Sequence, residues 1–234
     1  MASPFNIHKD ISKAETLPAS FYRDASMFET MKDQIFLKSW QWVGDQSLVK
    51  LPKSFYPFVL LDGYLTEPML LTHDNSGNIN CLTNVCTHRG NILAMSSGKS
   101  NKLTCDYHGR RFKLNGKFES MPEFEKTKDF PRPCDNLHQF PLKKWGPFLF
   151  AGLNPSFDFQ KVIDVMDQRI GFLPLDKFSL DNTLSKEYLV HAHWALYCDN
   201  YLEGFHIPFV HQGLNKVLDY GSYQTEIYDY CNVQ

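Results

Sequence analysis

Two short cysteine–histidine motifs constrain this chain of 234 residues more than any other feature. The first reads Cys86-Thr87-His88-Arg89-Gly90, and after sixteen residues that follow His88 the second reads Cys105-Asp106-Tyr107-His108-Gly109. Each motif offers one thiolate, one imidazole and a glycine, which suits two hairpin loops that approach one inorganic cluster from opposite sides. Zinc accepts the same ligand types, but Cys-x-His is tighter than the ~2 to 4 intervening residues of zinc fingers. The motifs therefore favour a cluster and leave zinc as the alternative.

The composition is that of a globular protein, with 43% hydrophobic and 21% charged residues and a formal net charge of −2. Such a balance offers no basic field for nucleic acid, so we expect no nucleic-acid partner. No segment approaches the ~18 apolar residues of a membrane span, and the N-terminus has no apolar leader segment, which together predict a soluble, cytoplasmic protein. The cysteines are too sparse for a disulfide framework. Four of them are expected to be small buried hydrophobic residues: Cys81, Cys134, Cys198 and Cys231.

Between Trp40 and about Leu153, short β-rich runs separated by turn signals predict an antiparallel β domain. The turns Asn75–Asn78 and Asn115-Gly116 have hairpin composition. Around this domain the hydrophobic periodicity predicts further elements. They are an amphipathic helix over Asp24–Trp40 with Ser26 and Glu29 as a capping box, a helix over Phe157–Ile170 stopped by Gly171, a strand over Leu184–His193 and a helix over Ala195–Phe205.

A second group of metal-binding residue types follows near the C-terminus. Glu203 and His206 are three residues apart, which would place both on one face of a helix. Pro208 should end that helix before His211, so that the two imidazoles converge from separate segments. Taken alone, two histidines at this spacing are more often structural than ligands, and Glu203 could be a solvated helix charge.

The first two motifs resemble those of the Rieske family, whose [2Fe-2S] cluster has two Cys on one iron and two His on the other. The resemblance implies Cys86 and Cys105 on one iron and His88 and His108 on the other. Arg89 and the lack of a further cysteine in either loop favour the low-potential oxygenase type. Oxygenases of this type usually read Cys-Pro-x-His-Gly-Trp, whereas this chain has Asp106 and Arg110 in place of Pro and Trp. These departures concern the aromatic cover of the cluster edge and the electron donor that docks there.

The segment HWALYCDNYLEGFHIPFVH resembles the opening of the catalytic domain of Rieske non-heme iron oxygenases. His193-Trp194-Ala195 replaces the usual Asn-Trp-Lys and Asp199 replaces a Glu. The family residues that match are Asn200, Glu203, His206 and His211. The resemblance implies His206 and His211 as ligands of a mononuclear Fe(II) site, with Glu203 and Asn200 in catalytic roles. The family's third ligand is an Asp expected beyond Gln234, so a chain that lacks most of the catalytic domain is expected.

The fold expected from the resemblance is mainly β with α (α+β). It comprises an N-terminal segment and helix (1–39), a Rieske [2Fe-2S] antiparallel β domain (40–155), and a linker helix followed by the start of an incomplete α+β catalytic domain (156–234). The late carboxylates Asp219, Glu226 and Asp229 fit the family's third-ligand pattern poorly.

The implied function is that of a terminal oxygenase component. Electrons would come from an NAD(P)H-dependent flavin or iron–sulfur reductase or a ferredoxin, pass through the cluster to Fe(II), and support O2-dependent hydroxylation of an aromatic or quaternary-ammonium substrate. In this family the electron crosses to a neighbouring subunit of a homotrimer through a carboxylate, here Glu203, and a Glu at that position favours choline- and carnitine-type monooxygenases over dioxygenases. A Rieske ferredoxin-like electron carrier and a structural zinc protein are the alternatives.

Overall fold

The computed structural model describes residues 5, 7–181 and 183–234. Contacts divide the chain into two compact units, which are described separately. One comprises Met1–Met31 and Asp181–Gln234, and the other Lys32–Leu180. The second, larger unit contains most of the strands and is called the β unit below; the first is called the terminal unit.

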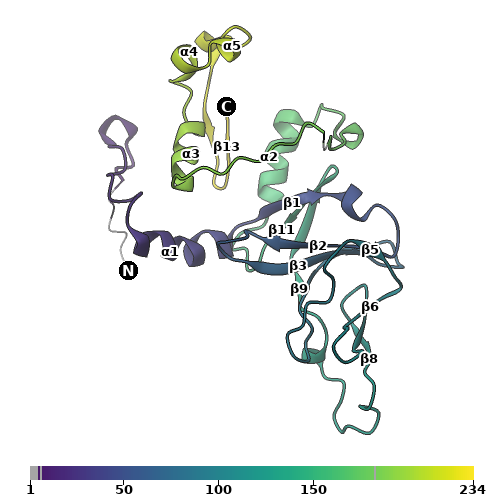
Figure 1. Cartoon of the computed structure of the whole chain (residues 1–234). Coiled ribbons are helices and arrows are strands. Elements are labelled where there is room, and N and C mark those ends of the chain that lie inside the picture. The colour runs from purple at the N-terminus through teal and green to yellow at the C-terminus, as the bar shows by residue number, and fades with distance from the viewer. Residues whose placement is uncertain (1–4, 6, 182) are drawn as a thin grey trace. The chain divides into compact units, whose positions relative to one another are not determined.

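The β unit is built from three antiparallel sheets (Figure 1). The sheet β5-β2-β3-β4-β9 consists of Gly98–Lys99, Ser54–Leu60, Glu67–His73, Ile79–Thr83 and Gln139–Phe140. The sheet β1-β11-β10 consists of Gln41–Asp45, Phe148–Ala151 and Leu142–Trp145. The sheet β6-β7-β8 consists of Lys102–Thr104, Arg111–Lys113 and Phe118–Ser120. The predicted antiparallel β domain is therefore confirmed.

The central strand β3 is buried on both faces, which fixes the layers of the β unit. Successive side chains of a strand point to opposite faces. Leu70 packs in one core cluster with Cys86 and Cys105, whereas Met69 and Leu71 pack in the other cluster. The second cluster also contains residues of the β1-β11-β10 sheet. The five-stranded sheet thus separates a core beneath the ligand-motif loops from a core beneath β11.

Both predicted hairpin turns are present. Asn75–Asn78 connects β3 to β4, which pair from Met69↔Thr83 to His73↔Ile79. Asn115-Gly116 connects β7 to β8, with Phe112 opposite Phe118. The helix α2 (Gln160–Ile170) follows β11 and is capped by Gly171, as the sequence predicted.

The helix predicted over Asp24–Trp40 is shorter in the structure. Helix α1 runs over Ala25–Gln34, and a separate 3₁₀ turn follows at Phe36–Lys38. The predicted capping box of Ser26 and Glu29 is also wrong. The Asp24 carboxylate accepts hydrogen bonds from the backbone N–H groups of Ser26 (2.8 Å) and Met27 (3.2 Å), so Asp24 satisfies the first turn.

The terminal unit is mostly helices and irregular segments. Its elements after residue 181 are α3 (Trp194–Tyr201), α4 (Ile207–Val210), α5 (Gln212–Asn215) and the pair β12–β13 (Glu226–Ile227 and Asn232–Val233). The strand predicted over Leu184–His193 is wrong, because the segment has no strand partner among the described residues and leaves Leu184, Tyr188 and Leu189 at least 75% exposed. An alternating pattern without a neighbouring strand does not form a sheet.

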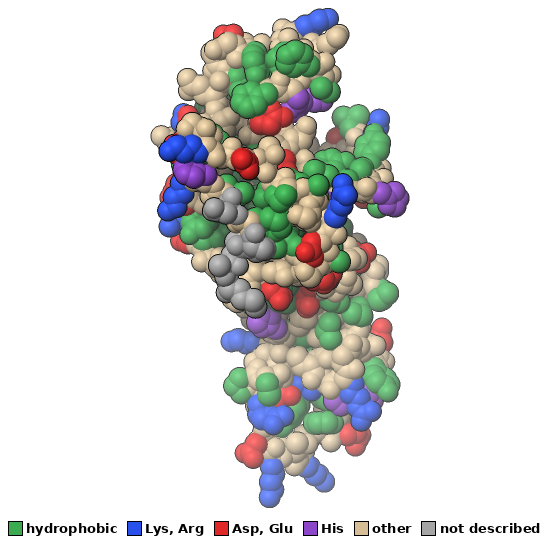
Figure 2. Space-filling model, turned by 90° about the vertical axis from the view of Figure 1, so that its left-hand side faces the viewer, with side chains coloured by type: hydrophobic (Ala, Val, Ile, Leu, Met, Phe, Trp, Pro, Cys, Tyr) green, Lys and Arg blue, Asp and Glu red, His purple; other side chains and the backbone are tan. Residues whose placement is uncertain are grey.

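Basic and acidic side chains are interspersed on the face drawn in Figure 2. Among the described residues, the chain has no helix long and apolar enough to cross a bilayer. Of the four cysteines expected to be buried, only Cys81 is, and burial raises its pKa to about 12. Cys134 and Cys198 are exposed and Cys231 is partly exposed, so that expectation is wrong for three of the four.

Candidate metal centres

The two cysteine–histidine motifs fold into two loops with the same hydrogen-bond frame. In the first loop, Cys86 N–H donates to the Asn91 carbonyl (2.8 Å) and Gly90 N–H to the Cys86 carbonyl (3.0 Å). In the second, Cys105 N–H donates to the Arg110 carbonyl (2.8 Å) and Gly109 N–H to the Cys105 carbonyl (2.9 Å). Each motif therefore closes on itself and presents its cysteine at the loop's first position.

The glycine of each motif is required by the loop geometry. Gly90 has φ of +73° and Gly109 has φ of +68°, in the left-handed region that residues with a Cβ rarely adopt. The positive φ turns the chain back so that the following carbonyl can accept from the cysteine N–H. Within this shared frame, His88 is the second residue after its cysteine, whereas His108 is the third residue after its own.

The two cysteine thiols lie together in the core. Cys86 and Cys105 are each 2% exposed and belong to the same core cluster. Burial raises the pKa of Cys86 and the neighbouring Cys105 thiol raises it further, while the His88 backbone N–H and the Arg110 guanidinium oppose the rise. Asn91 Nδ2 lies 3.7 Å from Cys105 Sγ as a donor. A buried thiol pair with donors directed at it suits two thiolates on one metal.

The two imidazoles also lie together. The ring centroids of His88 and His108 are 4.7 Å apart at 70°. His88 Nδ1 is inaccessible to solvent and has no hydrogen-bond partner within the described residues. Burial lowers the pKa of His88, helped by the charges of His108, Arg89 and Arg110. The neutral imidazole with an uncommitted nitrogen is the form that binds a metal.

The donor set fits a two-iron cluster. The side chains form a thiol pair and an imidazole pair, which matches two ligands on each of two irons. The buried Nδ1 of His88, which has no hydrogen-bond partner among the described residues, fits a nitrogen that binds a metal.

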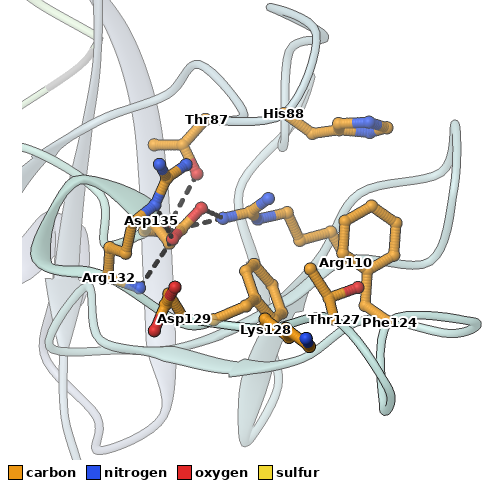
Figure 3. Close-up of a pocket in the computed structure, with 10 residues that line it drawn as sticks. Thr87, His88, Arg110, Phe124, Thr127, Lys128, Asp129, Arg132 and Asp135 are labelled. Carbon is orange, nitrogen blue, oxygen red and sulfur yellow. Dashed lines mark hydrogen bonds and ion pairs between the residues drawn. The ribbon is translucent and has the colours of Figure 1, made fainter.

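A third segment adjoins the two loops and was not found from the sequence. Asp135 is buried, and its carboxylate accepts a hydrogen bond from Arg110 Nη2 at 2.6 Å. Its backbone carbonyl accepts a hydrogen bond from Thr87 Oγ1 at 2.9 Å (Figure 3). A surface cavity of about 430 Å³ beside His88 is lined by these residues together with Phe124, Lys128 and Arg132. Asp135 is 25 residues beyond Arg110 and ends the short 3₁₀ turn Pro133–Asp135, so no periodicity predicts the pairing.

In the terminal unit, Glu203 and His206 come together, but not on a helix as predicted. Helix α3 ends at Tyr201, and both residues lie in the following turn. Glu203 Oε1 lies 2.5 Å from His206 Nδ1, and Glu203 Oε2 accepts a hydrogen bond from Phe205 N–H. The His206 hydrogen bond lowers the pKa of Glu203, so the carboxylate is charged at neutral pH. Glu203 is thus partly exposed and lies outside the helix, with its carboxylate in contact with His206.

His206 and His211 flank a single helical turn. Pro208 was predicted to end a helix, but it lies in the first turn of α4 instead. The first turn tolerates proline because its N–H groups have no partner within the helix. The rings of His206 and His211 are 5.0 Å apart at 74°. Both line a cavity of about 350 Å³, to which Asn200 and Glu203 also contribute. The residues singled out in this segment therefore share one cavity.

The Glu203–His206 pair determines what this cavity can do. A carboxylate on Nδ1 keeps the proton on that nitrogen and leaves Nε2 as the lone-pair donor. The Nε2 atom of His206 could therefore serve a metal, and Glu203 would act through His206. His211 supplies a second imidazole from the other end of α4.

Two departures from the family pattern have local explanations within the terminal unit. His193 replaces Asn but still caps α3, because its Nδ1 accepts from Ala195 N–H at 3.1 Å. Its ring contacts Phe21, Tyr22 and Phe28 at centroid distances of 5.4 to 5.8 Å. Asp199 replaces Glu and accepts a hydrogen bond from the Tyr22 hydroxyl.

Comparison with known proteins agrees with this geometry. Residues 39–131 match the model of the Rieske [2Fe-2S] domain. The chain is 27% identical to the chloroplastic choline monooxygenase of Arabidopsis thaliana, over all of this chain and 57% of that protein. It is 28% identical to the carnitine monooxygenase oxygenase subunit of Escherichia coli (strain K12), over 94% of this chain and 58% of that subunit.

The fold is also that of a solved structure. The quaternary ammonium Rieske monooxygenase CntA matches with a TM-score of 0.75 and 23% identity, over 92% of this chain and 59% of that one. The chain contains a Rieske [2Fe-2S] domain and is homologous to the oxygenase subunits of Rieske monooxygenases. In particular, its relatives include the choline and carnitine monooxygenases, of which it spans somewhat more than half the length.

Proposed function

We propose that the chain acts within a terminal oxygenase that hydroxylates a quaternary ammonium compound. The observation that carries the proposal is that similarity to the monooxygenases extends over 94% to 100% of the chain, and so includes the terminal unit as well as residues 39–131. A Rieske electron carrier would need the β unit alone. The names of the relatives supply the substrate class, as choline or carnitine.

In this proposal Cys86, Cys105, His88 and His108 hold the [2Fe-2S] cluster, and His206 and His211 hold a mononuclear iron. The cluster supplies one-electron transfer and the iron supplies O2 activation when they are bound. The protein's part is to bury the thiols, to keep His88 neutral and to fix the His206 tautomer through Glu203. Asn200 would contribute a polar group to the wall of the same cavity.

The surface of the terminal unit supports its place in a larger catalytic assembly. Phe205, Phe209, Val210 and Val217 are each at least 66% exposed. Large apolar side chains gathered at a surface mark sites that other protein covers. The incomplete mononuclear site agrees, since the described residues offer it two imidazoles.

A single-turnover reaction tests the proposed function. The protein is reduced, freed of reductant and mixed with isotopically labelled O2 and choline or carnitine. Monooxygenation places one labelled oxygen atom in the product and reduces the other to water, which consumes two electrons and two protons. The reduced cluster would supply one electron, added Fe(II) the other, and solvent the protons. With excess Fe(II) added to load the weak mononuclear site, we expect labelled product from the protein and none from His206→Ala. His191→Ala, an exposed histidine of the same unit, is the control. Reoxidation without labelled product would favour the electron-carrier alternative.

Iron stoichiometry is a separate expectation. We predict about two tightly held irons per chain, both in the cluster. Two neutral imidazoles define an iron site poorly, because no carboxylate ligand offsets the ferrous charge and Glu203 is already engaged with His206. Metal analysis after mild chelation measures the ratio. A third retained iron that is lost in His206→Ala but kept in His191→Ala would contradict the prediction and identify a completed mononuclear site.

We also expect the protein to form a homotrimer in which an electron crosses between subunits. His108 would donate its second N–H to Glu203 of the adjacent chain, which is useful only in a closed head-to-tail ring. Both carboxylate oxygens of Glu203 already have hydrogen-bond partners in their own chain. One of them would therefore have to accept a second hydrogen bond, from His108 of the adjacent chain. Mass measurement in solution gives the result, and a monomer at every concentration would remove this electron route.

A further inference from the structure

Arg110 is a buried cation at the end of the second ligand loop. Its carbonyl accepts the Cys105 N–H that closes the loop, and the residue is only 2% exposed. The guanidinium donates from Nη2 to Asp135 Oδ1 at 2.6 Å and to the Asp135 carbonyl at 3.1 Å. Nη1 lies 3.9 Å from Met121 Sδ. A buried arginine is unusual and needs a partner, which Asp135 supplies.

Aromatic rings enclose the guanidinium. Its carbon lies 4.9 Å from the ring centroid of Phe118, 5.6 Å from that of Phe130 and 5.7 Å from that of Phe112. These rings exclude water and hold the cation against their faces. In such surroundings a charge acts over several ångströms with little screening by solvent or salt.

The ion pair is joined to the first ligand loop. The Asp135 carbonyl accepts from both Arg110 and Thr87 (Figure 3), and Thr87 stands between Cys86 and His88 in the sequence. Arg110, Asp135 and His88 also line one cavity, so the ion pair stands beside a ligand of the first loop.

We propose that Arg110 raises the reduction potential of the [2Fe-2S] cluster, and that Asp135 holds Arg110 in place and moderates its effect. The inference rests on the cluster assigned under the proposed function. Reduction adds one electron to the cluster, so a nearby buried cation stabilises the reduced state more than the oxidised state. In the position where related oxygenases usually carry Trp, this chain has a charge that supplies electrostatic control of the cluster.

Redox titration of the intact protein, followed by the electron paramagnetic resonance signal of the reduced cluster, tests the proposal. At a fixed solution potential, we expect Arg110→Gln to lower the ratio of reduced to oxidised cluster at least tenfold, or about 59 mV for a one-electron couple. Asp135→Asn should raise the ratio, because it removes the anion and leaves the guanidinium. The double variant Arg110→Gln/Asp135→Asn should fall between wild type and Arg110→Gln.

The opposite signs separate an electrostatic role from a structural one, because disruption of packing would move both single variants in the same direction. If Arg110→Gln does not fold, the double variant and Asp135→Asn carry the test, since replacing both members of a buried pair is far less costly than removing one. Lys143 lies on β10, in a different sheet, and forms an exposed ion pair with Asp158. Lys143→Gln should leave the ratio of reduced to oxidised cluster unchanged.

Two results would overturn the proposal. Potentials that stay within error of wild type in Asp135→Asn and in the double variant would show that Arg110 has no electrostatic effect. Reduction potentials that shift in the same direction in Asp135→Asn and in the double variant would show a structural effect. A wild-type protein that gives no reduced-cluster signal would instead overturn the proposed function together with this inference, and so is distinguishable from either result.

Discussion

Replacing Cys105 with Ser is expected to abolish the visible colour and the reduced-state paramagnetic signal of the protein. Cys105 is 2% exposed and lies beside Cys86, and the thiolate pair would hold one iron of the cluster. A serine hydroxyl is a harder and far less acidic ligand, and it cannot replace a thiolate on that iron. The measurements are the absorption spectrum, the paramagnetic resonance spectrum after reduction and the iron content of the purified variant, which should fall from about two per chain toward zero.

Cys134→Ser provides the matched control. Cys134 is exposed and its side chain belongs to neither ligand loop, although it directly precedes the buried Asp135. The same Cys-to-Ser change there should retain the spectra and the iron. A normal reduced-state signal in Cys105→Ser would exclude the assignment of Cys105, and zinc in place of iron in the wild-type protein would favour the zinc alternative, since zinc gives neither colour nor signal.

The ligand loops were predictable from the sequence because their information is local. A cysteine, a histidine and a glycine within five residues specify a closed turn, and the glycines at positive φ confirm that the turn needs them. The hairpins at residues 75–78 and 115–116 were predictable for the same reason. Long-range packing carries no such local mark.

Three errors in the terminal unit and at the N-terminus have one physical origin. Hydrophobic periodicity predicted the strand at 184–193 and extended the helices at 24–40 and 195–205, but periodicity only states what an element could bury. Among the residues that the structure describes, no strand pairs with residues 184–193. Helix α3 ends at Tyr201, and the Glu203 carboxylate then accepts from Phe205 N–H and contacts His206. Glu203 and His206 still met, because a turn brings residues three apart as close as a helix does.

The Arg110–Asp135 pair shows the limit from the opposite side. The sequence revealed that Arg110 stands where Trp is usual, but its partner is separated by 25 residues of loop and short strand. Only the fold brings them together and encloses them in aromatic rings. The sequence therefore marks Arg110 as unusual, whereas its pairing with Asp135 depends on tertiary contacts.

Asp135→Asn is expected to lower the free energy of unfolding by about 3 kcal/mol at pH 7, because it leaves the Arg110 cation buried without its anion. That is a large part of the ~5 to 15 kcal/mol that stabilises a typical domain. The loss should depend on pH. Burial raises the pKa of Asp135, but hydrogen bonds from Arg110 and Arg132 outweigh it and hold that pKa below its ordinary value. The carboxylate therefore stabilises the fold above about pH 4 and ceases to do so as pH falls through its folded-state pKa.

Urea unfolding of wild type and Asp135→Asn, followed by tryptophan fluorescence at a series of pH values, measures this dependence. The two stabilities should differ most near pH 7 and begin to approach each other below about pH 4. They should meet as pH falls through the depressed folded-state pKa of Asp135, where the wild-type carboxyl also becomes neutral. Asp158→Asn makes the same substitution in the exposed pair with Lys143, at 3.5 Å and 61% exposed, where solvent screens the charges, so its unfolding midpoint should stay near that of wild type. A difference between wild type and Asp135→Asn that is equal at pH 7 and below pH 4 would assign the loss to packing of the amide, because a charge contribution must disappear when the carboxylate is protonated.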